Sequence, residues 1–318
     1  MDILALGEAM VEFNQTSAAD GRFYLQGFGG DTSNFAVAAA RQGARAGYVS
    51  ALGDDVYGAM LRAMWREEGV DDSGVPSDGD AFTAVYFVTH DAAGHHFSFF
   101  RRGSAASRLG PAQLPHAQIA AARVLHLSGI SMAISETARE ACFAAIETAR
   151  RAGVKVSFDT NHRAKLWPLA LAQATIAAAI AASDICLPSF DDLALLTGLD
   201  SPEAMVEHCL DLGARIVALK HGANGAWLAE GERRVRIAPH PCTPVDATGA
   251  GDAFGGAFVA RLVAGDDLAR AGAYAAATAA LATEGYGAVA PIPHAARVRE
   301  ALGTAQPDAP GPWNDPAR

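Results

Sequence analysis

A run of small residues between two carboxylates, Asp246-Ala247-Thr248-Gly249-Ala250-Gly251-Asp252, is the stretch of this sequence best suited to chemistry. A short extended run precedes it, and Phe254, Phe258 and Leu262 follow at intervals of four residues, which predicts a helix that begins at the glycines. The first N–H groups of a helix lack internal acceptors and carry partial positive charge, so this turn could hold a phosphate or a developing negative charge. Asp252 would then lie beside the anion, where a carboxylate can accept the proton of an attacking hydroxyl.

The same stretch also admits a purely structural interpretation. An acidic residue in the first turn stabilises a helix without any ligand, because its charge interacts favourably with the helix dipole. Spacing alone does not separate the two interpretations. The remaining polar residues and the elements that carry them must decide.

The elements that would position these residues follow an alternation of strands and helices. Residues 3–7 and 47–53 are apolar runs typical of strands buried on both faces, and residues 31–42 read as a helix with Asp31 or Thr32 as its N-cap. Further on, predicted strands at 124–127, 154–158, 185–187 and 216–219 alternate with predicted helices at 135–151, 169–182, 191–197 and 201–212. This alternation predicts a right-handed, mostly parallel α/β sheet.

Short extended segments of mixed polarity interrupt the alternation in the N-terminal half. They are residues 10–13 and 23–28, together with an alternating pair at 82–89 and 95–100 that residues 91–94 join as a hairpin. We expect them to form a small accessory sheet inserted into the larger fold. Residues 303–318 contain four prolines and two glycines, which predicts a loose C-terminal tail.

Composition narrows the range of functions. The chain has 318 residues, 50% of them hydrophobic, and a formal net charge of −10, with no concentrated run of Lys or Arg that could neutralise a nucleic-acid backbone. The four cysteines have neither metal-ligand spacing nor the density of a disulfide framework, which indicates reduced thiols. No signal peptide and no membrane-spanning stretch is apparent. We therefore expect a soluble, cytoplasmic protein that binds neither nucleic acid nor membranes.

Polar residues that directly follow predicted strands are the next candidates, because ligands of open α/β sheets bind beyond the carboxyl ends of the strands. These residues are Asp159, Asn161 and Arg163 after one strand, Lys220-x-Gly222-x-x-Gly225 after another, and Gly30, Asp31 and Asn34 at a turn into a helix. The Lys220 motif could equally be a turn between two strands. For Arg163, the neighbouring polar residues favour a ligand role of the guanidinium over a surface ion pair. Neither a Walker P-loop nor a dinucleotide-binding glycine fingerprint is present.

Together these motifs resemble the two signatures of ribokinase-like (PfkB-type) carbohydrate kinases. Gly29–Asn34 is similar to the first signature, Asp246–Asp252 is similar to the second, and the Lys220 motif falls between them. The resemblance covers residues 1–302 and implies a single ribokinase-like domain. Such a domain has three αβα layers around a mostly parallel sheet, with a small β-sheet lid from segments about 10–28 and 82–102.

The resemblance also implies an activity, which is phosphorylation of a sugar-like hydroxyl with ATP and Mg²⁺. Asp252 would be the catalytic base, and Gly249, Ala250 and Gly251 would supply N–H groups around the transferring phosphoryl group. The implied nucleotide-binding residues are Asn161, Ser189, Lys220, Gly222, Gly225, Thr248, Gly249 and Gly251. The sugar would be held by Gly30, Asp31, Asn34 and Asp252. A monovalent cation near Asp246 and a homo-oligomer formed through the lid are further implications.

Within that family, the runs Gly29–Asn34, Phe99–Ser107 and Asp159–Trp167 together resemble 2-keto-3-deoxygluconate kinases. That substrate is an acid, and arginines at Arg101 and Arg163 suit it because a guanidinium binds a carboxylate in a two-pronged fashion. The resemblance further implies three roles in this chain: a substrate-facing lid tyrosine at Tyr86, a substrate contact at Phe99 where the family often has a tyrosine, and a metal-linked carboxylate at Asp192.

Two other functions stay open at the level of sequence. The first is a fructokinase or another neutral-sugar or nucleoside kinase of the same fold, which would not need two arginines at its substrate. The second is a non-catalytic regulator that binds a sugar or a nucleotide. The intact Asp252 argues against the regulator.

Overall fold

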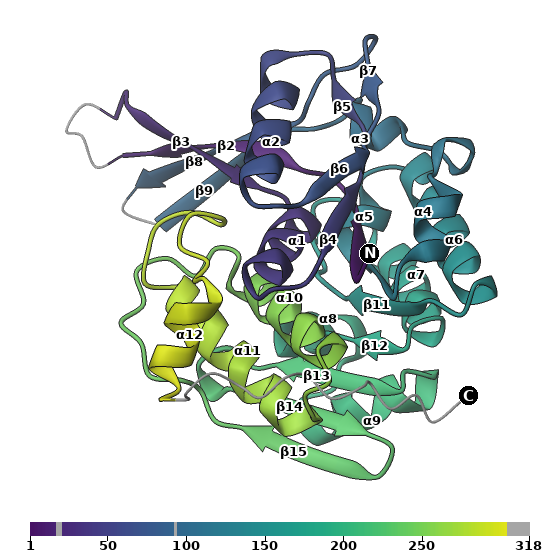
Figure 1. The fold of residues 1–318 in the computed structure, drawn as a ribbon, viewed down its shortest axis with the longest axis vertical. Helices are drawn as coiled ribbons and strands as arrows, with labels where there is room; N and C mark the ends of the chain where they lie inside the picture. The colour runs from purple at the N-terminus through teal and green to yellow at the C-terminus, as the bar shows by residue number, and fades with distance from the viewer. Residues whose placement is uncertain (17–20, 92–93, 304–318) are drawn as a thin grey trace.

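The computed structural model describes residues 1–16, 21–91 and 94–303, which form one large sheet, smaller sheets and the helices that surround them (Figure 1). The predicted tail beyond Gly303 and the tip of the predicted hairpin at 92–93 lie outside the described residues. None of the helices in the described ranges combines the length and the apolar character that a membrane crossing requires.

The large sheet confirms the predicted parallel architecture. Its nine described strands have the order β15-β14-β13-β12-β11-β10-β1-β4-β6. Neighbouring strands are parallel except at one edge, where β14 pairs antiparallel with both β13 and β15. The strands are β1 (Ile3–Leu6), β4 (Ala46–Val49), β6 (Asp71–Gly74), β10 (Val124–Ser128), β11 (Lys155–Asp159), β12 (Ile185–Cys186), β13 (Ile216–Lys220), β14 (Ala226–Glu230) and β15 (Arg233–Ile237). The chain leaves β1 toward β4 on one side and later returns to β10 on the other, so the strand order switches at β1.

Helices cover both faces of this sheet because alternate residues of each strand point to opposite sides. Ile3 and Ala5 pack into one core, whereas Leu4 and Leu6 pack into the other. The helices of the first core are α1 (Asp31–Arg41), α2 (Val56–Glu67), α10 (Ala250–Val263), α11 (Leu268–Ala282) and α12 (Ala295–Ala301). Those of the second are α3 (Ala105–Arg108), α4 (His116–Ala121), α5 (Gly129–Ala133), α6 (Glu136–Arg151), α7 (Leu169–Ala181), α8 (Phe190–Thr197) and α9 (Pro202–Leu212).

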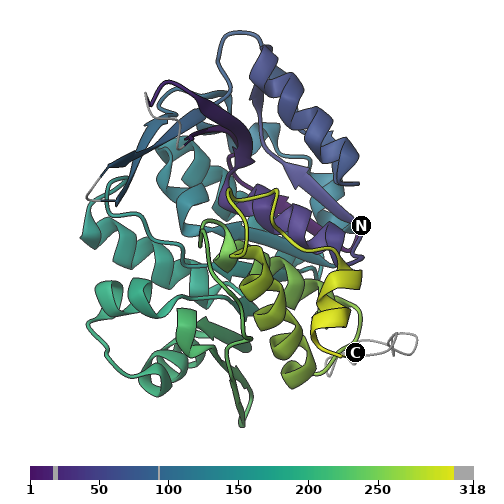
Figure 2. The same ribbon diagram turned by 90° about the vertical axis from the view of Figure 1, so that its left-hand side faces the viewer.

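The predicted accessory sheet is present and stands out from the large sheet in both views (Figures 1 and 2). Its strands are β2 (Met10–Gln15), β3 (Tyr24–Gly29), β8 (Val85–Asp91) and β9 (Gly94–Phe100), in the order β3-β2-β8-β9. A two-stranded sheet of β5 (Leu52–Gly53) and β7 (Ser77–Asp78), and 3₁₀ turns at Pro111–Gln113 and Gly222–Asn224, complete the described elements. Short pieces such as α3, α4 and α5 carry too little periodicity to be found from the sequence.

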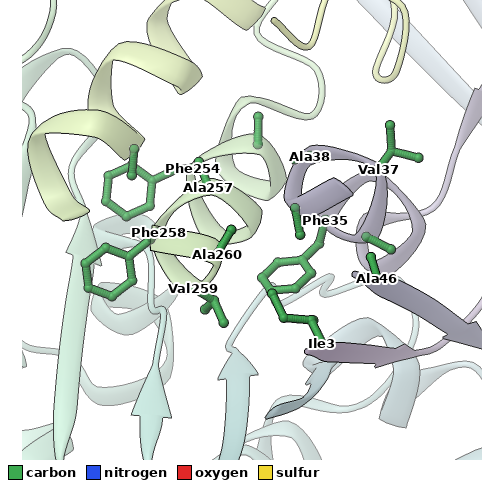
Figure 3. Packing of buried hydrophobic residues seen from close by; sticks show 14 of the residues in the cluster. Ile3, Phe35, Val37, Ala38, Ala46, Phe254, Ala257, Phe258, Val259 and Ala260 are labelled. Atoms are coloured by element: carbon green, nitrogen blue, oxygen red, sulfur yellow. The ribbon is translucent and has the colours of Figure 1, made fainter. Parts of the chain in front are cut away.

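A close crossing of α1 and α10 lies at the centre of the first core (Figure 3). Phe35 and Ala38 of α1 meet the face of α10 that carries Gly255 and Gly256. A β carbon added at Gly256 would collide with the carbonyl oxygen of Phe35 and lie 2.7 Å from the Ala38 β carbon. The two backbones therefore touch, which fixes the start of one helix relative to the start of the other.

The predicted N-cap of α1 is wrong. The helix begins at Asp31, its N-cap is Gly30, and no side chain caps it. Both expected caps are committed to tertiary contacts, because Asp31 accepts a hydrogen bond from Asn161 (2.7 Å) and the Thr32 hydroxyl bonds that of Tyr48 (2.8 Å).

Replacing Gly256 with alanine should destabilise the protein by about 1–3 kcal/mol, because the added methyl group forces two packed backbones apart. The free energy of unfolding in urea measures the loss. Gly79→Ala is the matched control, since a β carbon there meets nothing within 4 Å. An unchanged urea midpoint for Gly256→Ala would show that the crossing is not tight.

Candidate active site

Two helix starts and the carboxyl ends of two strands converge at one place beside the large sheet. Asn34 on α1 donates a hydrogen bond to Asp252 on α10, at 2.8 Å between Nδ2 and Oδ2. Asn161, just after β11, donates to Asp31 at the start of α1. Lys220, at the end of β13, forms an ion pair with Asp159 at the end of β11. Residues that lie far apart in sequence and were predicted to share a site thus come together.

The carboxyl group of Asp252 has the properties of a general base. Burial of the group among protein atoms, reinforced by the nearby Asp31 carboxylate, raises the pKa of Asp252 to about 8, while the Asn34 hydrogen bond opposes this rise. A base with a pKa near the working pH can accept a proton and later release it. The residue as a whole keeps part of its surface accessible, as contact with a substrate requires.

The start of α10 presents backbone donors beside Asp252. Gly249 is its N-cap, with a φ of 76° that suits glycine, and the first helical hydrogen bond joins the Ala253 N–H to the Gly249 carbonyl at 2.8 Å. The N–H groups of Gly251 and Asp252 therefore have no acceptor within the helix. Ala250 differs from expectation, because its N–H donates to the Ala247 carbonyl at 3.2 Å.

A cationic side chain lies next to these donors. A β carbon added at Gly251 would be only 3.6 Å from the Lys220 ammonium nitrogen. The positive charge of Lys220 and the positive end of the α10 dipole thus act at the same point, where an anionic group would be stabilised. Asp159 accompanies this lysine, and burial raises the pKa of Asp159 although Lys220 opposes the rise.

The turn before α10 is fixed through Asp246. Its Oδ1 accepts the N–H of Thr248 (2.9 Å) and the hydroxyl of Thr248 (2.6 Å), and its Oδ2 accepts the N–H of Gly287 (3.0 Å). Asp246 is 7% exposed. The second carboxylate of the motif therefore shapes the turn that carries the donors and connects it to the loop of Gly287.

The Lys220–Gly225 segment forms a turn between β13 and β14. Gly225 has a φ of 86°, and a β carbon there would collide with the carbonyl of Ile237. The turn alone therefore explains why a glycine occupies position 225. At Gly222, in contrast, a β carbon would meet nothing within 4 Å. Ser189 caps α8 and pairs with Lys220 in a parallel bridge, so it lies at the same edge of the sheet. The predicted nucleotide contacts of these residues stay a prediction.

Asp192 is held in a fixed orientation near this edge. Its Oδ2 accepts the Thr160 hydroxyl (3.2 Å) and the His162 N–H (3.1 Å). Across the described residues, no group of three or more His, Cys, Asp or Glu side chains is arranged to hold a metal ion. A metal here would therefore have few protein ligands, as Mg²⁺ has when phosphate oxygens and waters complete its octahedron.

The two arginines predicted to bind a carboxylate differ sharply in their surroundings. Arg101 follows β9 and forms an ion pair with Glu8 at 2.5 Å, with the Glu8 side chain fully buried. Ser104 also donates to Glu8, at 2.6 Å. Arg163 is exposed, and its Nη1 donates to the carbonyl of His162 at 2.9 Å. The contacts of Arg163 therefore do not join it to the Asp252 cluster.

The aromatic residues predicted at the substrate lie on one face of the small sheet. Tyr86 is 4% exposed and donates its hydroxyl proton to Glu12, while its ring stacks on that of Phe99 with 5.6 Å between centroids. The Arg101 guanidinium lies 5.7 Å from the Phe99 ring. Tyr86, Phe99 and Arg101 thus form a continuous group.

Two buried carboxylates of this region, Glu8 and Glu12, were not among the predicted site residues. Glu8 carried a signal in the sequence, because it directly follows the predicted strand at 3–7. Glu12 carried none, since acidic residues are common in short strands of mixed polarity.

The comparison with known families is decisive. Residues 1–295 match the sequence profile of the pfkB family carbohydrate kinases. The chain belongs to this family. Among curated pfkB relatives it is 37% identical to "Fructokinase-1" of Oryza sativa subsp. japonica over 268 residues, covering 82% of this chain and 83% of that protein. It is 34% identical to "2-dehydro-3-deoxygluconokinase" of Thermoproteus tenax over 295 residues, covering 88% of each.

A solved pfkB-like structure agrees with the fold. A putative ribokinase II from E. coli, in complex with ATP and Mg²⁺, superposes with a TM-score of 0.87 at 25% identity, covering 95% of this chain and 99% of that one. The ribokinase-like fold and the sugar-kinase activity of this pfkB chain are thereby established. Relatives named for two different sugars, fructose and 2-dehydro-3-deoxygluconate, are similarly close to it.

The raised pKa of Asp252 predicts a stability change with a defined pH dependence. Because the folded state holds the Asp252 proton up to about pH 8 and the unfolded state releases it near pH 4, the wild type loses stability across this window. Asp252→Asn carries no such group. Its melting temperature should exceed that of the wild type by a margin that grows from pH 5 to pH 8 and then levels off. A margin independent of pH would contradict the raised pKa.

Proposed function

We propose that this kinase transfers the γ-phosphoryl group of ATP to a hydroxyl of 2-keto-3-deoxygluconate, which yields 2-keto-3-deoxy-6-phosphogluconate. The observation that carries the phosphoryl transfer is the position of Asp252. Its carboxyl group, with a pKa near 8, lies at the start of α10 beside the Lys220 ammonium. A base, backbone donors and a cation are then available at one point, where a hydroxyl loses its proton as the phosphoryl charge spreads.

Residues of the two helix starts have separate roles in the proposed transfer. Gly30, Asp31 and Asn34 hold the sugar, and Asp252 accepts the proton of the attacking hydroxyl. That oxygen forms a bond to the γ-phosphorus while the bond from this phosphorus to the ADP oxygen breaks. The N–H groups of Gly251 and Asp252 stabilise the charge on the transferring group, with the Gly249 turn and Ala250 holding them in place.

The nucleotide would lie along the strand ends that carry Asn161, Ser189, Lys220, Gly222, Gly225 and Thr248. Asp192 fits a Mg²⁺ ion, because two hydrogen bonds to one oxygen orient its carboxylate. The ion would neutralise the ATP phosphates. A monovalent cation near Asp246 and a cytoplasmic location, where ATP is available, belong to the same proposal.

Two observations bear on the choice of sugar. The exposed guanidinium of Arg163 is available for a carboxylate, which supports the sugar acid. The ion pair between Arg101 and Glu8 supports a second candidate, a neutral ketose such as fructose, because it cancels the charge that an acid would need. The similarity to both a 2-dehydro-3-deoxygluconokinase and a fructokinase fits either sugar.

Activity with Mg²⁺-ATP against 2-keto-3-deoxygluconate, 2-keto-3-deoxygalactonate and fructose tests these candidates. We expect the keto-deoxy acids to be preferred, and Arg163→Ala to raise their KM by about 10- to 100-fold, since a charge-assisted hydrogen bond contributes about 1.5–3 kcal/mol. Arg102→Ala, which removes another exposed arginine, next to Arg101 in the sequence, is the matched control.

A preference for fructose, together with an unchanged KM for fructose in Arg163→Ala, would contradict the sugar-acid proposal and assign the neutral sugar. Asp252→Asn should still bind ATP but lose nearly all turnover with every sugar. A fully active Asp252→Asn protein would refute the proposed role of the base.

We also propose that residues 1–302 act as a single domain and that the small sheet is its lid, which excludes water during transfer and pairs with the lid of a second copy. The small sheet and the residue that precedes β3 expose several large apolar side chains. They are Phe23, Tyr24, Leu25, Phe97, Phe99 and Phe100. Contact with another lid would cover part of this surface.

Leu25→Lys should shift the protein toward the monomer, because a lysine charge in the buried centre of an interface is costly. Sedimentation velocity across a range of concentrations measures the shift. Leu195→Lys is the control, since Leu195 on α8 is 53% exposed and lies outside the small sheet. A wild type that is monomeric at all concentrations would refute pairing through the lid.

A further inference from the structure

A buried carboxylate lies in the small sheet, outside the Asp252 cluster. Glu12 on β2 is 2% exposed, and its Oε2 accepts the hydroxyl proton of Tyr86, its partner across the strands on β8. Asn14 donates to the same carboxylate. Burial raises the pKa of Glu12, whereas both hydrogen bonds favour its charged form. In this geometry Glu12 accepts a hydrogen bond from each of the two neighbours.

Two glycines of β3 leave room for this pair. A β carbon at Gly27 would lie 3.0 Å from Glu12 Oε1, and a β carbon at Gly29 would collide with the Tyr86 hydroxyl. Since alternate residues of a strand share a face, both glycines lie under the Glu12–Tyr86 pair. Gly29 directly precedes Gly30, so the phenol oxygen lies at the turn that begins α1.

The pair is also fixed from the opposite side. A β carbon at Gly287 would lie 3.2 Å from Glu12 Oε1, and the Gly287 N–H is bound by Asp246. Arg41 donates to the carbonyl of Val289 (3.1 Å) in the same loop. Glu12 is thus enclosed between β3 and the loop that fixes the turn before α10, and it cannot turn away from Tyr86.

This arrangement determines which kind of hydrogen bond Tyr86 can offer to a ligand. A phenol has a single proton to donate, and the Tyr86 proton is committed to Glu12. The phenol stays neutral, because burial and the nearby Glu12 and Asp252 carboxylates raise the pKa of Tyr86 well above its ordinary value. Its oxygen can therefore only accept one more hydrogen bond.

We infer that Glu12 is a positioning residue that takes the hydrogen bond of the Tyr86 hydroxyl proton. Tyr86 then accepts a hydrogen bond from a sugar hydroxyl, and a carboxylate or keto oxygen at that position is disfavoured. The inference rests on the proposed function and on the predicted position of Tyr86 at the sugar. A carboxylate oxygen beside Tyr86 would meet a second acceptor with no proton between them, and buried acceptors without a donor are costly. A sugar acid must then direct a hydroxyl toward Tyr86 and its carboxylate elsewhere.

The test is a double-mutant cycle with Glu12→Gln and Tyr86→Phe, read as kcat and as separate KM values for sugar and ATP. Glutamine keeps the shape of Glu12 but can also donate, so Tyr86 is no longer held as an acceptor. We expect each single variant to raise the sugar KM by about 5- to 30-fold while the ATP KM changes less than about twofold. The double variant should resemble Tyr86→Phe alone, because Glu12 acts through Tyr86.

A deoxy analogue of the accepted sugar identifies the hydroxyl involved. The analogue that lacks the donating hydroxyl should have the same KM with wild type and with Tyr86→Phe. Glu207→Gln, which makes the same charge change at an exposed position, should leave every constant unchanged. Independent, multiplicative effects of Glu12→Gln and Tyr86→Phe would overturn the inference and assign Glu12 a purely structural role.

Thermal shifts on addition of each sugar separate this inference from the proposed function. If the wild type phosphorylates a sugar but Glu12→Gln and Tyr86→Phe have independent effects, only the role of Glu12 is overturned. A wild type that binds a sugar without phosphorylating it overturns the proposed transfer to that sugar, and the same cycle read in binding still decides the role of Glu12. A wild type that binds no sugar of the panel overturns both.

Discussion

The contact between α1 and α10 is the constraint on which the site depends. Because Gly256 allows the two helix backbones to touch, Asn34 on one helix reaches Asp252 on the other at 2.8 Å. The same contact brings the Asp31 and Asp252 carboxylates close enough to repel, which is part of why the pKa of Asp252 rises. The packing of the core therefore helps to raise the pKa of Asp252, the proposed base, and this rise costs stability above the pH at which the unfolded carboxyl ionises.

The small sheet is tied to this centre by apolar packing and by buried polar contacts. Val11 of β2 is part of the first core, and the separate cluster of Met10, Ala84, Tyr86 and Val88 is small. Glu8 precedes β2 and Arg101 follows β9, so their ion pair joins the entry and the exit of the sheet. Hydrogen bonds and ion pairs depend on direction and distance more steeply than apolar contacts do, and they fix the angle at which the sheet meets the body.

The sequence predicted the large elements and the order of the motifs because each depends on local pattern. Apolar runs and helical periodicity located the parallel strands, and strand ends located Asp159, Asn161 and Lys220. Pairings across long separations have no such signal. The Glu8–Arg101 pair spans more than 90 positions, and the N-cap of α1 was mispredicted because Asp31 and Thr32 serve distant partners instead. Side-chain partners within the site were therefore the part that only the fold could reveal.

These pairings also bear on which sugar can enter. In the proposed function, Glu8 cancels the charge of Arg101, so the carboxylate of a sugar acid depends on Arg163 for a positive partner. Burial raises the pKa of Glu8, although Arg101 opposes this rise. A proton on Glu8 would leave the charge of Arg101 without this partner. In the proposed function, the preference for an acid or a neutral sugar therefore depends on the Glu8–Arg101 ion pair as well as on Arg163.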